Sequence, residues 1–586
     1  MKLKKRLQKI YLKEKLTAGI CILLLLTGCS GDAAVEDAGS QDMVVESSIS
    51  ENAEEETEEA PVQPAEGETE AEDPGEAQAQ SAEGEMTAED LGEAPEEDVS
   101  MGEGPVFVLW EDAGLEDHVM EWGDRTLQHH MEGITGIHDR DIMLSDVWEY
   151  TELNLDFGGE HGEHIASDGT IYAISNYIQC IDALEELKNL QVLNLEFQSA
   201  LDDISVLSSL TNLRELNLWH IEGLGKCDLS DLSALSGLKN LEVLNLGGNF
   251  SIRDLSALSG LTNLRELNLA YQRYIDDLSA LSGLTNLEKL DLRCDRFQYG
   301  DNGIRDLSAL SGLTNLRELN LDDNQISDII ALSGMKNLEI LEMEDNEISD
   351  ISALSGLTNL QKLNLKSNNI SGDVNALGGL TNLQELYLGW NEIRDISGLA
   401  GAINLRELNL TGNRVSDIGA LSGMKNLERL DLGANEIQDI SSLRGLTNLQ
   451  VLGLGNNKIS DFSALDGMIN LQELYLSHSE ISDLTFLKGL TNLKRLFLGY
   501  NEISDLSALS GLTNLKWLFL DYNEISDISA LSGLTNLERL ILSHNNVSDL
   551  GALSGLSNLN YLSVGDNPLK DDAYSAVSSV EEVNNY

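Results

Sequence analysis

The stretch Leu316-Arg-Glu-Leu319-Asn-Leu321-Asp-Asp-Asn324-Gln-Ile326-Ser-Asp328-Ile329 decides the fold. Its L-x-x-L-x-L pattern recurs seventeen times between residues 190 and 564. From residue 316 onward the first leucine returns every 22 residues, apart from one extra residue near Gly372. A period of roughly 20 to 29 residues is typical of a solenoid of stacked coils. Since alternate residues of a strand point to the same side, each L-x-L predicts a short strand with its leucines inward.

Stacking one strand of this kind per coil predicts a parallel sheet. No single repeat can bury its own leucines, so neighbouring coils must bury them jointly. The Ser-Asp-Ile-Ser-x-Leu segment that follows each strand predicts a short helical turn on the opposite side. We therefore expect an α/β repeat solenoid, a curved right-handed superhelix with a concave parallel β-sheet and with 3-10 or helical turns on its convex side.

An asparagine ends most of the predicted strands. Its side-chain amide can bond backbone groups of adjacent coils that would otherwise be buried without a partner. This asparagine stands at Asn324, Asn346, Asn368, Asn391, Asn413, Asn435 and Asn457.

An aspartate precedes most of the predicted turns and can cap the turn through its carboxylate. A calcium-binding ladder is the alternative, but calcium needs six to eight oxygens and the ladder offers one carboxylate per coil. We therefore favour the capping role. These aspartates are Asp328, Asp350, Asp395, Asp417, Asp439, Asp461, Asp483, Asp505, Asp527 and Asp549.

Units that read L-T-N-L-x-x-L-x-L-x-x-N-x-I-S-D-I-S-A-L resemble the 22-residue leucine-rich repeats of the internalins and related bacterial surface proteins. The resemblance implies a leucine-rich-repeat fold over residues 181–567, with a small helical N-terminal cap and a degenerate first repeat at 106–180. We expect residues 568–586 to form a C-terminal cap, helix-like at 572–580. We expect no immunoglobulin-like module after the repeats, so host-cell invasion does not follow from the resemblance.

The first 29 residues resemble a bacterial lipoprotein signal peptide. A lysine-rich start precedes an apolar run at 18–26, which is too short to span a bilayer. The run ends in Leu26-Thr27-Gly28-Cys29, which is similar to a lipobox and implies lipidation of Cys29. This predicts an extracytoplasmic protein on the bacterial cell surface, held to the membrane only through its lipid.

An acidic segment follows at residues 30–105, with 26 acidic residues and no basic residue from position 31. So few apolar side chains predict a disordered linker. The whole chain has 37 Lys plus Arg against 100 Asp plus Glu, a formal net charge of −63. This charge excludes nucleic acid as a partner, because phosphates would be repelled.

Few residues of the sequence indicate metal binding or catalysis. His161-Gly-Glu-His164 near Asp168 holds metal-ligand residue types, but it lacks the helical spacing of zinc peptidases, and we favour a solvated loop. Cys180, Cys227 and Cys294 match no metal motif and predict no disulfide framework. Since no catalytic motif is present either, we expect a non-enzymatic protein without a cofactor or metal site.

Outward-facing strand positions change character late in the chain. The position between the second and third leucines is mostly polar in early repeats and apolar in four successive later ones, and the position three residues on is aromatic or histidine there. An isolated pair occupies the same two positions earlier. The candidate ligand-binding residues are Tyr475, His478, Phe497, Tyr500, Trp517, Phe519, Tyr522, Ile541 and His544, with Tyr561 alongside, and the pair Tyr387 and Trp390.

An exposed aromatic strip of this kind indicates a recognition surface for a protein or a glycan. The alternative is that the rings only pack against one another across strands. The acidic surroundings favour a basic or neutral ligand. Insertions at 219–232 and 293–306 are further candidate contact loops. We therefore predict a lipid-anchored binding protein, with a structural envelope scaffold that has no ligand pocket as the alternative.

Overall fold

The computed structural model describes residues 108–155, 163–165, 171–173, 178–198, 200–201, 203–220, 229–294 and 303–585. All of them belong to one compact unit, Asp98–Tyr586. Cys29, the signal peptide 1–29 and the linker 30–105 lie outside the described residues, as do Cys227 and most of both insertions.

Nineteen strands form one parallel sheet in which each strand pairs with that of the next coil. The central leucines stay in register, so that Leu341 pairs with Leu319 on one side and with Leu363 on the other. The strands are β1 (Glu152–Asn154), β4 (Val192–Asn194), β5 (Glu215–Asn217), β6 (Val243–Asn245), β7 (Glu266–Asn268), β8 (Lys289–Asp291), β9 (Glu318–Asn320), β10 (Ile340–Glu342), β11 (Lys362–Asn364), β12 (Glu385–Tyr387), β13 (Glu407–Asn409), β14 (Arg429–Asp431), β15 (Val451–Gly453), β16 (Glu473–Tyr475), β17 (Arg495–Phe497), β18 (Trp517–Phe519), β19 (Arg539–Ile541), β20 (Tyr561–Ser563) and β21 (Glu582–Asn584).

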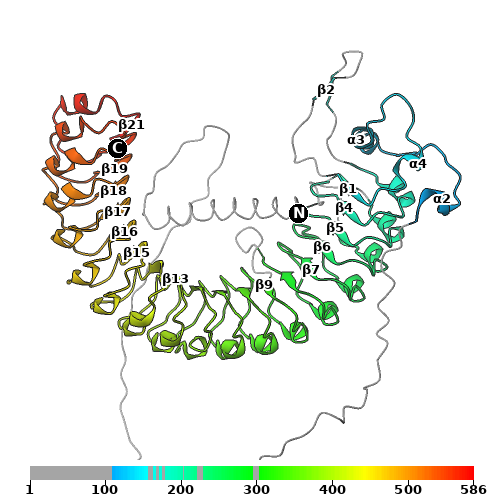
Figure 1. Cartoon of the computed structure of the whole chain (residues 1–586), viewed down its shortest axis with the longest axis horizontal. Coiled ribbons are helices and arrows are strands. Elements are labelled where there is room, and N and C mark those ends of the chain that lie inside the picture. The colour runs from blue at the N-terminus through cyan, green and yellow to red at the C-terminus, as the bar shows by residue number, and fades with distance from the viewer. Residues whose placement is uncertain are drawn as a thin grey trace, which may run out of the picture. The chain divides into compact units, whose positions relative to one another are not determined.

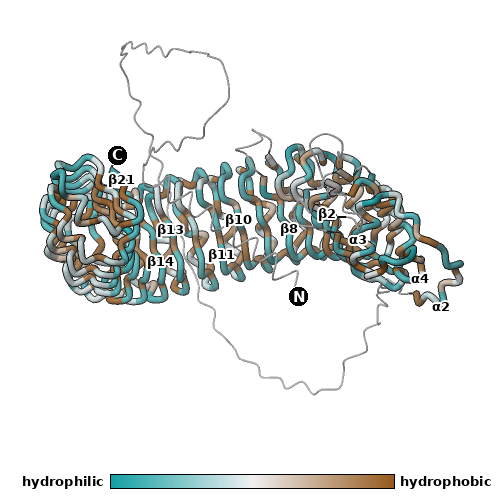
Figure 2. Tube along the Cα trace, turned by 90° about the horizontal axis from the view of Figure 1, so that it is seen from above, coloured by the Kyte–Doolittle hydropathy of each residue, from teal (hydrophilic) through white to brown (hydrophobic). Residues whose placement is uncertain are grey.

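The strands of this unit lie on the inner side of a curved solenoid, and short 3-10 helices lie on its outer side (Figure 1). In the described residues these 3-10 helices run from η1 (Asp182–Glu186) to η18 (Ala573–Val577). Hydrophobic and hydrophilic stretches alternate in bands across the solenoid (Figure 2). The predicted fold class, a leucine-rich solenoid with a concave parallel sheet, is confirmed.

The inward leucines form one continuous core from Met120 to Val577. In the coil of β9, for example, Leu316, Leu319 and Leu321 are at most 1% exposed. Burying a leucine side chain contributes roughly 1.5–3 kcal/mol, and each coil receives this contribution only when its neighbours are in place. The core therefore fixes the outward positions as straight columns across the sheet.

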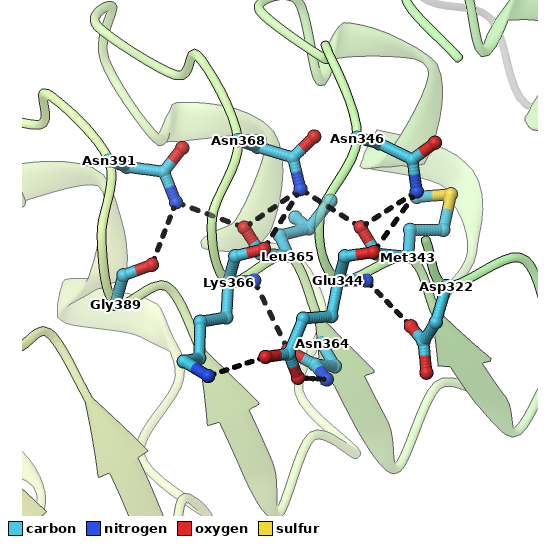
Figure 3. A network of polar contacts seen from close by, with 10 residues as sticks. All are labelled: Asp322, Met343, Glu344, Asn346, Asn364, Leu365, Lys366, Asn368, Gly389 and Asn391. Carbon is cyan, nitrogen blue, oxygen red and sulfur yellow. Dashed lines mark hydrogen bonds and ion pairs between the residues drawn. The ribbon is translucent and has the colours of Figure 1, made fainter. Parts of the chain in front are cut away.

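The asparagine that ends most strands joins adjacent coils as predicted (Figure 3). The amide of Asn368 donates to the carbonyl of Met343 in the preceding coil at 2.9 Å and to that of Leu365 at 3.1 Å. Its Oδ1 accepts from the backbone N–H of Ile348 at 3.0 Å. Asn368 is only 6% exposed, so these bonds satisfy groups that water does not reach.

The aspartates before the turns act as caps. Asp350 Oδ1 accepts from the N–H of Ser352, the first residue of its 3-10 helix, at 2.8 Å. This bond is the largest of the effects that lower the pKa of the Asp350 carboxyl. The same bond forms at all ten predicted positions, Asp328, Asp350, Asp395, Asp417, Asp439, Asp461, Asp483, Asp505, Asp527 and Asp549.

A second asparagine ladder was not predicted. The asparagine of each L-T-N-L unit donates to a backbone carbonyl of the preceding coil, as Asn359 does to Lys336 at 2.9 Å. The same arrangement recurs at Asn382, Asn404, Asn426, Asn448, Asn470, Asn492, Asn514, Asn536 and Asn558. The solenoid is thus tied by two side-chain ladders as well as by the sheet.

The N-terminal cap contains the short helices α2 (Trp110–Ala113), α3 (Arg125–Thr135) and α4 (Leu144–Val147). Asp124 caps α3 by accepting from the N–H groups of Thr126 and Leu127. Where we expected a solvated loop, the chain forms an antiparallel pair, β2 (Glu163–Ile165) and β3 (Ile171–Ala173). His161 and Asp168, whose residue types could ligate a metal, lie outside the described residues, as does the side chain of His164.

The C-terminal cap differs from the expected helix. Only Ala573–Val577 is helical, as the 3-10 helix η18, and the chain then adds the strand β21 to the sheet. Val583 pairs with Leu562 of β20, so it takes the place of the central leucine. The segment lacks the leucine spacing by which the other strands were predicted.

Candidate functional site

Two columns of rings cross the concave sheet over β16–β19. In the central column Tyr475 stacks on Phe497 with ring centroids 4.4 Å apart, and Phe497 stacks on Phe519 at 4.5 Å. Ile541 of β19 pairs with Phe519 and continues this column. The in-register pairing of β16 to β19 places these side chains side by side.

The distal column lies just beyond the C-terminal ends of the same strands. His478 and Tyr500 stack at 4.2 Å, Tyr500 and Tyr522 at 4.1 Å, and Tyr522 and His544 at 3.9 Å. The planes of these rings lie within 16° of each other. Sequence reasoning therefore placed both columns correctly, and together they form the aromatic strip: Tyr475, Phe497, Phe519, Ile541, His478, Tyr500, Tyr522 and His544.

The expectation that the whole strip is exposed is wrong at Phe497. Its side chain is only 5% exposed, because Tyr475 covers one face of the ring and Phe519 covers the other. Tyr522 of the distal column is 41% exposed. A ligand would therefore contact the distal column more directly than the middle of the central one.

The distal column has an unusual backbone. His478, Tyr500, Tyr522 and His544 have φ between 53° and 59°, in the left-handed region. Asp345, at the same place in its coil, has φ of 55°. Asparagine, aspartate and glycine tolerate this region best, whereas a bulky residue costs roughly 1–2 kcal/mol there. Aromatic residues in four successive coils thus need a compensating benefit.

A third column flanks the strip on its other side; sequence reasoning named its Trp517 and Tyr561 but missed its arginines. It consists of the first outward residue of each strand from β16 to β20, and we call it the arginine column. The Arg495 guanidinium lies over the Trp517 ring at 4.2 Å, and that of Arg539 lies over the Tyr561 ring at 4.2 Å. Arg539 is also 5.9 Å from the Trp517 ring. The members are Glu473, Arg495, Trp517, Arg539 and Tyr561. The alternation of arginine and aromatic residues every 22 positions was the signal that could have found it.

Two lysines stand beside the arginine column, at the residues that precede β17 and β18. Lys494 donates to Gln472 Oε1 at 2.7 Å, and Lys516 pairs with Glu538 at 2.6 Å. Arg495 pairs with Glu473 at 3.1 Å. Within the part of the chain that the structure describes, no carboxylate pairs with Arg539.

One carboxylate, Asp521, lies within this surface. It follows β18, between Phe519 and Tyr522 in the sequence, and it is half-buried. Burial raises the pKa of its carboxyl, and the nearby His478 and His544 oppose that shift.

The isolated pair Tyr387 and Trp390 does not join the strip, because it stands on the coil of β12, four coils before β16. The Tyr387 hydroxyl donates to Glu385 Oε2 at 3.2 Å, and burial raises its pKa. Trp390 is 52% exposed and has left-handed φ, like the distal column.

A separate aromatic cluster lies on the early coils. His220 contacts Phe197 and Phe250 edge-on, each with centroids 5.7 Å apart. Trp219 contacts Tyr271 in the same manner at 5.9 Å. Trp219 and His220 belong to the first insertion, whose residues 221–228 lie outside the described part, as do Phe297 and Tyr299 of the second insertion. Cys294 is buried, and its thiol donates to the Gln272 carbonyl at 3.5 Å, whereas Cys180 is half-buried.

A polar groove of about 900 Å³ runs along the residues that precede β12–β16. Its side chains largely bond one another or the backbone, as when Arg406 Nε donates to Glu428 at 2.8 Å and Gln472 donates to Gln450 at 3.1 Å. It is lined by Asn382, Gln384, Asn404, Arg406, Asn426, Glu428, Asn448, Gln450, Asn470 and Gln472. Among the described residues, no group of three or more His, Cys, Asp or Glu side chains could hold a metal ion.

The fold and its repeat define a class of protein. The family model described as leucine rich repeats, in two copies, matches residues 211–260, 296–334, 314–356, 336–379, 358–401, 403–445, 425–467, 447–489, 513–546 and 535–575. A second model, described as leucine rich repeat, matches residues 469–525. The chain belongs to the leucine-rich repeat family. Proteins of this family are in general binding scaffolds, and nothing in the comparisons indicates catalysis.

The fold agrees with that of a solved structure. A leucine-rich repeat protein of Leptospira interrogans is 24% identical, with 70% of this chain and 100% of that chain covered and a TM-score of 0.56. An internalin, inlF, of Listeria monocytogenes is 26% identical over 75% of this chain and 95% of its own, with a TM-score of 0.35. Internalin C2 of the same species is 33% identical over 36% of this chain and 83% of its own, with a TM-score of 0.28. No curated protein matches the chain. In the described residues, no helix has both the length and the apolar character that crossing a membrane requires.

Proposed function

We propose that the chain is a lipid-anchored binding protein of the bacterial cell surface, which captures a protein or a glycan on the concave face over β16–β20. Cys29 would carry the lipid, because the residues before it resemble a lipobox. Replacement of Cys29 by alanine would then release the protein from membranes, whereas replacement of the buried Cys294 would not.

The observation that carries the proposal is the convergence of three columns on one face. The central column, the distal column and the arginine column lie side by side on the same strands, since β16 to β20 pair in register. Tyrosine, tryptophan and arginine are the residues most enriched at the energetic centres of protein interfaces. Here all three meet on one surface of a solenoid.

A gain in stability alone does not account for the strip. Each aromatic pair contributes about 0.5–1.5 kcal/mol beyond burial, and each bulky residue with left-handed φ costs roughly 1–2 kcal/mol. For Tyr500 and Tyr522 these two effects roughly cancel. Recognition of a ligand is a benefit that explains why aromatic residues stand where aspartate or asparagine would fold equally well.

The test is capture of partners from envelope extracts, host-surface proteins and a glycan array by the full chain. The variant Tyr500→Asn/Tyr522→Asn removes two rings and suits left-handed backbone, as Asn456 does at the same place on the coil of β15. The matched control is Asp345→Asn on the coil of β10. We expect saturable binding of a partner to be lost in the tyrosine variant and kept in the control, while the thermal stability of the tyrosine variant falls only slightly.

The structural scaffold is the second candidate. The stacking itself favours this candidate, because each ring is largely covered by the rings next to it. A scaffold predicts no saturable partner and a defect in envelope assembly when the gene is deleted. Partners that bind the tyrosine variant as well as the parent protein would refute the strip as the binding site.

A further inference from the structure

Because the rings stack face to face, mainly their edges are accessible to a ligand. In the aromatic strip the stacked centroids are 3.9–4.5 Å apart and the planes lie within 23° of each other, so most ring faces are covered by the next ring. The Trp517 ring is covered in turn by Arg495. Sugar rings bind aromatic side chains through their faces, whereas ring edges carry partial positive charge. The strip therefore suits an apolar group beside an anion better than a sugar ring.

The local charge reverses along the concave sheet. We compare five outward positions per coil: the residue before the strand, its two outward residues, and the first and second residues after the third leucine. Over β9–β11 these positions hold seven acidic and three basic residues, whereas over β16–β20 they hold four of each. The excess of basic residues, four against two, is confined to β17–β19. The acidic residues of the first set are Glu318, Asp322, Asp323, Glu339, Glu342, Glu344 and Asp345. The basic residues of the second set are Lys494, Arg495, Lys516 and Arg539.

This local charge outweighs the net charge of the chain at contact distance. Charges separated by more than about 8 Å are largely screened at physiological salt. An anion over the arginine column would feel the nearby guanidinium groups more than the formal charge of −63 spread over the chain. The proposal below therefore departs from the expectation of a basic or neutral ligand, which was drawn from the chain's overall acidity.

Arg539 is the best placed of these cations. Its guanidinium lies between the Trp517 and Tyr561 rings, which hold its plane. In the described part of the chain no carboxylate pairs with it, so its N–H groups can donate to an incoming one. A stacked arginine is preorganised for a two-pronged bond to a carboxylate.

We propose that β16–β20 bind an extended protein segment that carries acidic side chains next to apolar ones, the carboxylates at the arginine column and the apolar groups at the ring edges of the distal column. The inference rests on the proposed function and names the chemistry of its partner. Five coils, separated by four spacings of about 4.8 Å, span about 19 Å, the length of roughly five or six extended residues.

The experiment is selection of a displayed random dodecapeptide library on the immobilised full chain, followed by affinity measurement of the enriched peptides. The variants are Arg539→Gln and Arg495→Gln, and the matched control is Arg429→Gln, which has the same position on β14 outside the strip. We expect enrichment of Asp or Glu beside apolar residues. The affinity should fall at least about tenfold in Arg539→Gln, which corresponds to one lost charge-assisted bond, and stay unchanged in the control.

The other outcomes separate the two proposals. Enrichment of neutral or basic peptides that still require Tyr500 and Tyr522 would overturn the acidic partner and keep the strip as a binding site. Binding of polygalacturonate that requires Arg539, without any enriched peptide, would show that the anion belongs to a glycan and overturn the protein segment. Absence of any binding that depends on the strip would overturn both.

Discussion

Strands β9–β11 and β17–β19 are built on the same coil but present opposite surfaces. In both regions the inward leucines are buried and an asparagine ties the coil to its neighbours, as Asn346 and Asn523 show. The outward positions are acidic and hydrogen-bonded in the first region, and aromatic and basic in the second. The repeat therefore fixes the scaffold, while the outward positions are free to differ, and that is where function must be sought.

The acidic side chains on β9–β11 take part in a network of ion pairs and hydrogen bonds. Glu344 pairs with Lys366, and its backbone N–H donates to Asp322 Oδ1 at 2.6 Å (Figure 3). Burial, together with the charge of Glu342, raises the pKa of Asp322 to about 8. The side chains here bond one another, whereas on β17–β19 Arg539 has no carboxylate partner in the described residues.

The largest expected effect is on stability, and it tests the asparagine ladder that the two regions share. Asn346→Ala and Asn523→Ala each leave one buried N–H and at least two carbonyls without the amide that now serves them. At roughly 1–3 kcal/mol per unsatisfied group, each variant should lose about 3 kcal/mol or more of unfolding free energy. Urea unfolding should give losses of similar size. A loss confined to one region would contradict a common scaffold.

The second prediction compares how much each of the two ring columns contributes to stability. Phe497→Ala removes a ring that is buried between two others, and a buried Phe→Ala change costs about 3 kcal/mol or more. Tyr522→Asn removes a half-exposed ring and relieves left-handed strain, so it should cost less than about 1 kcal/mol. Thermal melting checks both values. Equal losses would mean that the distal column serves stability.

The third effect is a pH dependence specific to the acidic region. Unfolded Asp322 loses its proton near pH 3.9, and folded Asp322 near pH 8. Between these values the folded state holds the extra proton, so the free energy of unfolding falls as pH rises, by at most about 1.4 kcal/mol per unit. Asp322→Asn should remove this decline and leave the protein more stable than the parent at pH 8. An unchanged pH profile would show that Asp322 is ionised in the folded state.

Much of the fold could be predicted because its period is so regular. The spacing of the leucines fixed the strands, and the recurrence of Asn368 and Asp350 in their coils fixed the ladder and the caps. The same regularity placed Tyr500 and Tyr522 in one column through their spacing of one repeat. The strand β21 escaped prediction because Val583 takes the place of a leucine.

The site was only partly predictable. Position in a column follows from the period, but burial depends on how neighbouring rings tilt, so the stacking that covers Phe497 could not be read from spacing. The arginine column was visible in the sequence as Arg495, Trp517 and Arg539, yet ring contacts alone gave it a role. The second asparagine ladder was overlooked because an exposed asparagine gives no sign of a backbone partner.

The most direct test is hydroxyl-radical footprinting of the full chain, alone and with a partner recovered in the capture experiment. The account predicts that oxidation of Tyr500, Trp517 and Tyr522 falls when the partner binds, while oxidation of Trp390 and of the exposed Tyr274 on the early coils stays the same. Protection of Trp390 or of the early coils, with no change at Tyr500, Trp517 and Tyr522, would contradict the claim that β16–β20 form the binding surface.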